Sequence, residues 1–107
     1  HQMSYDAARP AFHSDAEKWT YIANVLPVQR MQEQELLKQL AKGLWELKIL
    51  RGMIAEIPPD SPLAYQVPEM TACCERQTLQ YEVWTREVRE RLEWIEDTLL
   101  HMPGPEH

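Results

Sequence analysis

Glycine is scarce in this chain, which has three glycines in 107 residues. Eight prolines are present, and most of them gather near residues 58–68 and 103–105. Proline interrupts helix interiors, so the long stretches between these clusters are free to be helical. The composition therefore predicts an all-α fold. We expect an antiparallel pair of long helices with a short N-terminal helix, packed as a helical bundle or in a coiled-coil-like manner.

Long apolar runs are also missing, and no stretch approaches the roughly 20 residues that a membrane-spanning helix needs. Cysteine is limited to the neighbours Cys73 and Cys74. Adjacent positions on a helix point about 100° apart, so a disulfide between them would need a strained backbone. We expect free thiols. With no recognisable signal peptide, these features predict an intracellular protein, either cytoplasmic or nuclear, without membrane contact.

Basic residues are few: the chain has 11 Lys and Arg residues and 17 Asp and Glu residues, which gives a net charge of −6. The excess negative charge lies in residues 58–107. Binding to a phosphate backbone depends on clustered Lys and Arg, so an acidic chain without a basic stretch is a poor candidate for nucleic-acid binding. We expect a protein partner instead.

Recognisable chemical motifs are absent from the sequence. There is no glycine-rich phosphate loop, no C-x-x-C pair and no nucleophile motif. The four histidines sit near the predicted ends, and Asp97 with His101 is the single helical pair that resembles part of a metal site. We expect no catalytic residue, no cofactor and no metal, and hence a protein that is not an enzyme.

Helix boundaries can be placed from capping residues and prolines. Ser14 and Glu17 form a capping-box pattern, and Pro27 disfavours helical geometry at Leu26. The prediction is one helical domain over residues 14–102, between an N-terminal tail over 1–13 and a C-terminal tail over 103–107. Its expected helices cover about 14–25, 27–57 and 68–102, and the proline-rich segment 58–68 connects the last two.

Apolar side chains form stripes along both long helices at spacings of three and four residues. The expected core stripe of the second helix is Leu36, Leu40, Leu44, Leu47, Leu50, Ile54 and Ile57, and that of the third is Tyr81, Trp84, Val88, Leu92, Ile95, Leu99 and Met102. Other large apolar residues fall outside these stripes. We predict a partner interface at Trp45, Ile49, Met53, Trp94 and Leu100.

Two long helices and one short one cannot cover all of these apolar rows. The leading hypothesis is therefore a non-enzymatic protein–protein interaction or oligomerisation module, as a homodimer or as a subunit or scaffold of a larger complex. One alternative is a small helical enzyme or ligand-binding regulator with an anion pocket between the helices, using Arg30, Lys42 and Arg51. Another is an acidic helical chaperone or antitoxin that masks a basic partner.

Overall fold

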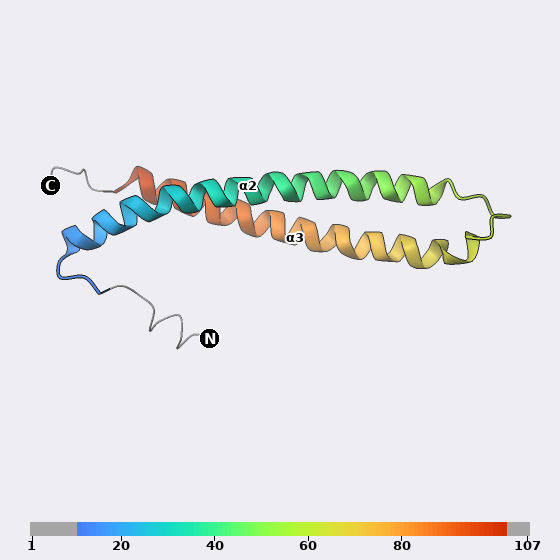
Figure 1. The fold of residues 1–107 in the computed structure, drawn as a ribbon, viewed down its shortest axis with the longest axis horizontal. Helices are drawn as coiled ribbons and strands as arrows, with labels where there is room; N and C mark the ends of the chain where they lie inside the picture. The colour runs from blue at the N-terminus through green and yellow to red at the C-terminus, as the bar shows by residue number, and fades with distance from the viewer. Residues whose placement is uncertain (1–10, 103–107) are drawn as a thin grey trace.

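Two long helices packed side by side make up the computed structural model, which describes residues 11–102 (Figure 1). Helix α2 covers Asp15–Ala55, the short 3-10 helix η1 covers Ala64–Gln66, and helix α3 covers Val67–Leu100. The prediction of an all-helical chain with two long helices packed on each other is confirmed. Residues 1–10 of the predicted N-terminal tail over 1–13 and the whole predicted tail over 103–107 lie outside the described residues.

Helix α2 begins as the capping pattern predicts. Ser14 is the N-cap in an extended conformation, and its Oγ accepts a hydrogen bond of 3.2 Å from the backbone N–H of Glu17. This bond satisfies one of the backbone donors that the first turn of a helix leaves without a partner. The ring of Phe12, just before the helix, packs on Tyr21 with 5.3 Å between ring centroids.

The separate helix predicted over 14–25 is not confirmed, because α2 continues through Pro27. Proline has no N–H for the carbonyl of Ala23, but Ala23 is exposed and water can reach that carbonyl. Leu26 is 5% exposed, and burying a leucine contributes about 1.5–3 kcal/mol, comparable with the cost of an interior proline. Figure 1 shows the first part of α2 inclined to the rest of the helix.

Replacing Pro27 with alanine should stabilise the protein. The substitution restores the missing backbone hydrogen bond to Ala23, and the gain is reduced by the greater freedom of the unfolded chain. We expect the free energy of unfolding to rise by about 1–2 kcal/mol in urea denaturation. Pro68→Ala is the matched control, because Pro68 lies in the first turn of α3 and should change stability little. A decrease for Pro27→Ala would contradict a continuous α2.

A seven-residue repeat runs along the line where the two helices meet, here called the seam. Alternating steps of three and four residues connect the seam positions on α2 at 26, 30, 33, 37, 40, 44, 47, 51 and 54. The same steps connect those on α3 at 71, 74, 78, 81, 85, 88, 92, 95 and 99, and continue to Met102 just beyond the end of the helix. The mean spacing of 3.5 residues is that of left-handed coiled coils, whose helices cross at about 20°.

Across the seam, residues early in α2 contact residues late in α3, and residues late in α2 contact residues early in α3. Glu33 pairs with Arg91 at 2.9 Å, and Arg51 pairs with Glu75 at 2.7 Å. Between them, Gly43 faces the ring of Tyr81 so closely that an added Cβ would overlap it. The chain therefore turns back through residues 56–66, and α3 returns along α2 (Figure 1).

The core of this helix pair is narrow. Its central cluster consists of Leu40, Val88 and Leu92, and Val88 is the most deeply buried of them at 1% exposure. Three residues of the expected core stripes, Leu36, Leu50 and Trp84, are instead 38%, 45% and 44% exposed. Each lies one position from the seam, because a supercoiled pair with a repeat of 3.5 residues contacts Leu37, Arg51 and Thr85 there instead.

Threonines occupy several seam positions on α3 without leaving a polar group unpaired. The hydroxyl of Thr78 donates to the carbonyl of Cys74 at 2.8 Å, and that of Thr85 donates to the carbonyl of Tyr81 at 2.7 Å. Each hydroxyl is satisfied within its own helix. Among the described residues, no buried side-chain nitrogen or oxygen lacks a hydrogen-bond partner.

Candidate protein-interaction surface

Large apolar side chains cover much of the outside of the helix pair. Two helices in one layer contact each other along one line, so most of the circumference of each helix has no protein neighbour. The exposed large hydrophobic residues are Trp19, Tyr21, Val28, Met31, Leu36, Trp45, Ile49, Leu50, Met53, Leu63, Tyr65, Leu79, Val83, Trp84, Trp94 and Leu100. Within residues 11–102 they outnumber the eight buried hydrophobic residues two to one, which makes the outer surface the most unusual feature of the described chain.

Three of the predicted interface residues form a continuous strip, here called the outer row. Trp45, Ile49 and Met53 are 64%, 41% and 60% exposed and follow one another at four-residue steps on α2. By helical periodicity the outer row points away from α3, because Trp45 lies about 140° around the helix from the buried Leu40. Nothing within the described chain covers it.

The other two predicted interface residues lie elsewhere. Trp94 is 60% exposed and Leu100 is 78% exposed, both on α3. The Glu33–Arg91 contact places Trp94 near residue 30 of α2, about 22 Å along the axis from Trp45. Six residues separate Trp94 from Leu100, so the two side chains point about 120° apart. The five predicted residues are all exposed but do not form a single patch.

A groove that the sequence stripes did not predict lies beside the seam at mid-length. This central groove has a volume of about 260 Å³ and is lined by Leu36, Leu40, Trp84, Glu87, Val88 and Arg91. Leu40 and Val88 form its buried floor, and the half-exposed rings and methyl groups of Trp84 and Leu36 form its walls. A strict seven-residue repeat, read in place of a period of 3.6, would have placed Leu36 and Trp84 beside the seam.

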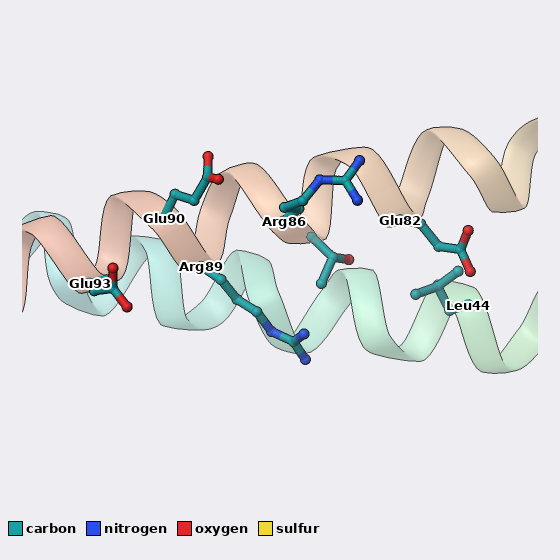
Figure 2. Close-up of a pocket in the computed structure, with 7 residues that line it drawn as sticks. Leu44, Glu82, Arg86, Arg89, Glu90 and Glu93 are labelled. Atoms are coloured by element: carbon teal, nitrogen blue, oxygen red, sulfur yellow. The ribbon is translucent and has the colours of Figure 1, made fainter.

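The opposite side of the seam carries a groove of different character. It has a volume of about 420 Å³ and is lined by Leu44 together with Glu82, Thr85, Arg86, Arg89, Glu90 and Glu93 of α3. Figure 2 shows these acidic and basic side chains spread along α3, with Leu44 reaching in from α2. Three carboxylates are mixed with two guanidinium groups, so no single sign of charge dominates the groove. It is a solvated polar surface.

One strong ion pair borders the central groove. Nε and Nη2 of Arg91 donate to both carboxylate oxygens of Glu33 at 2.9–3.1 Å. The hydrogen bond to this carboxylate raises the pKa of Arg91 further above its usual value, and charge attraction to Glu33 and Glu87 acts in the same direction. Such a bidentate pair fixes the planar guanidinium in one orientation. It therefore holds one wall of the groove in place.

The residues proposed for an anion pocket do not come together. Arg30 and Arg51 lie on α2 about 32 Å apart along the helix axis, and Arg51 is paired with Glu75. Lys42 is exposed on the outer side of α2. Within residues 11–102 no group of three or more potential metal ligands occurs, and no helix there is long and apolar enough to cross a membrane. Cys73 is exposed, Cys74 is buried, and neither forms a disulfide.

Comparisons with known proteins identify no relative: no protein family, no curated protein and no solved structure matches the chain. The surface itself is therefore the starting point for a functional proposal.

Proposed function

We propose that this antiparallel helical hairpin is a non-enzymatic protein–protein interaction or oligomerisation module. The supporting observation is the outer row, whose three large side chains are 41–64% exposed, so covering the exposed part of each would contribute roughly 0.6–2 kcal/mol. A binding partner that covers these side chains would supply the apolar contacts that the two-helix layer lacks. Tryptophan and methionine are also enriched among the residues that contribute most to protein interfaces.

Site-specific photo-crosslinking in the cells that make the protein tests this proposal. A photoreactive amino acid at Trp45 or Met53 should form a covalent adduct with a defined protein, which mass spectrometry then identifies. The matched control places the same amino acid at Gln34, an exposed polar position of the same helix. Adducts from the outer row and none from Gln34 are the expected result.

Charged substitutions separate an interface from a structural role. Ile49→Lys should weaken adduct formation at the neighbouring Trp45 at least tenfold, and Trp94→Lys should do the same at an exposed site next to Trp94. The helical circular dichroism of both variants should stay within about 10% of that of the unchanged protein. Gln34→Lys adds the same charge and should change neither quantity. If no position forms an adduct, or if the helicity is lost in both variants, the outer surface is not an interaction site.

A further inference from the structure

The side of the hairpin that holds the central groove is poor in charge, and the opposite side is rich in it. On the groove side, the positions that flank the seam on α2 are 25, 29, 32, 36, 39, 43, 46, 50 and 53, where Glu46 is the one charged residue. The corresponding positions on α3 are 70, 73, 77, 80, 84, 87, 91, 94 and 98, where Glu87 and Arg91 are the charged residues. The other side of α3 carries the charged groove of Figure 2. Depletion of charge is typical of the centre of a protein interface.

From this asymmetry we propose that the groove side binds a second copy of this chain, so that two hairpins form a four-helix bundle. The inference rests on the proposed function and identifies the partner and the surface. Two hairpins stacked face to face would bury Leu36 and Trp84 of both copies at the centre of the bundle, above the floor formed by Leu40 and Val88. The bundle core would then have four helices around it in place of two.

The size of the groove side suits a partner of the same length. Helix α3 has 34 residues, so it is about 50 Å long, and two helices about 10 Å wide give a face of roughly 1,000 Å². A stable interface buries about 800 Å² on each partner. A single short peptide would leave most of this face uncovered, whereas a second hairpin would cover it from end to end.

Charge complementarity favours an arrangement in which α2 of one copy lies over α3 of the other. Helix α2 has six basic and five acidic residues, and helix α3 has four basic and eight acidic residues. A two-fold axis parallel to the hairpin brings these oppositely charged helices together at the same height along the bundle. Pairing α2 with α2 and α3 with α3 would place the acidic helices against each other.

This arrangement predicts one specific contact between copies. The Arg51–Glu75 pair shows that residue 76 lies at the height of residue 50, so Glu46 and Arg76 are about 6 Å apart along the axis. Glu46 sits at the outer edge of the groove side, and Arg76 lies on the back of α3, one position from the groove-side Gln77, where it pairs with Glu69 of its own helix at 3.6 Å. In the stacked pair, Glu46 of one copy would reach Arg76 of the other, once on each edge of the interface. Trp45 and Ile49 of the outer row stay accessible in this bundle and remain free for a further protein, whereas Met53 lies at the edge of the groove side.

Light scattering on the purified chain over a concentration series tests the proposal. The unchanged protein should have twice the chain mass of 12.6 kDa. Trp84→Lys should lower the mass to that of a monomer, and Trp45→Lys, which changes the same residue type on the outer row, should not. Glu46→Arg should increase the dimer dissociation constant at least tenfold, and the double variant Glu46→Arg with Arg76→Glu should restore it.

Each result of the light-scattering measurements either supports or overturns the proposed dimer. A monomer at every concentration, a mass above two chains, or a dimer that Trp45→Lys dissociates and Trp84→Lys does not would overturn the proposal. The charge-exchange variants test the proposal even if Trp84→Lys fails to fold. The proposal is also overturned if the dimer dissociation constant is unchanged in both Glu46→Arg and the double variant. A monomer that still forms crosslinks through the outer row removes the second copy as partner and leaves the interaction function standing.

Discussion

Val88→Asp should unfold the hairpin. Val88 is 1% exposed and packs with Leu40 and Leu92 in the central cluster. The substitution places a carboxylate among apolar groups, so it must either stay charged without solvent or take up a proton. A cost above about 4 kcal/mol is expected, which is most of the stability of a domain of this size.

The matched control is Val83→Asp on the same helix. Val83 is 36% exposed, so its carboxylate remains in water and the cost should stay below about 1 kcal/mol. Circular dichroism and urea denaturation at equal protein concentration measure both effects. Similar stabilities for the two variants would mean that the Leu40–Val88–Leu92 cluster does not hold the helices together.

Gly43→Val should destabilise the protein strongly, and Gly52→Val should not. At Gly43 a Cβ would overlap the ring of Tyr81 across the seam, whereas at Gly52 nothing lies within 4 Å of an added Cβ. Overpacking of this kind costs about 1–3 kcal/mol and more when the side chain is branched and rigid. The helix propensities of glycine and valine differ by only a few tenths of a kcal/mol, so propensity affects the two sites alike.

We therefore expect a difference of about 3 kcal/mol in the free energy of unfolding between the two glycine variants. Urea denaturation followed by tryptophan fluorescence measures it, at one protein concentration because association also contributes to stability. Combining Gly43→Val with Tyr81→Ala should recover part of the loss by making room for the new methyl groups. Equal stability of the two single variants would show that α2 and α3 do not approach closely at this point.

The helical class, the cap at Ser14 and the packing of two long helices were predictable because they depend on local signals. Helix capping, proline clusters and apolar periodicity act over a few residues. Pro27 was misjudged for a different reason: burial of Leu26 against α3 is a long-range contact that the local preference of the residue before a proline does not include. Local signals were thus enough to predict where α2 starts, whereas predicting that it continues past Pro27 required knowledge of long-range packing.

The candidate surface was predictable in part. Exposure of Trp45, Ile49 and Met53 agrees with their place outside the expected core stripe, although their role as an interface stays a prediction. The groove beside Trp84 was missed because a period of 3.6 assigns that residue to the core, and only the coiling of two helices around each other shifts it to the side. Sequence periodicity identifies a helical face, but the partner determines which edge of that face is buried.

Gly43, beside the seam, also decides how the two helices are aligned. A seven-residue repeat permits several registers, because sliding α3 by one repeat returns a seam position to a seam position. Such a slide would bring Tyr81 opposite residue 36 or 50, where leucine stands in place of Gly43, and would separate Glu33 from Arg91. One small residue facing one large ring therefore selects a single register from a set that the repeat alone would leave nearly equal in energy.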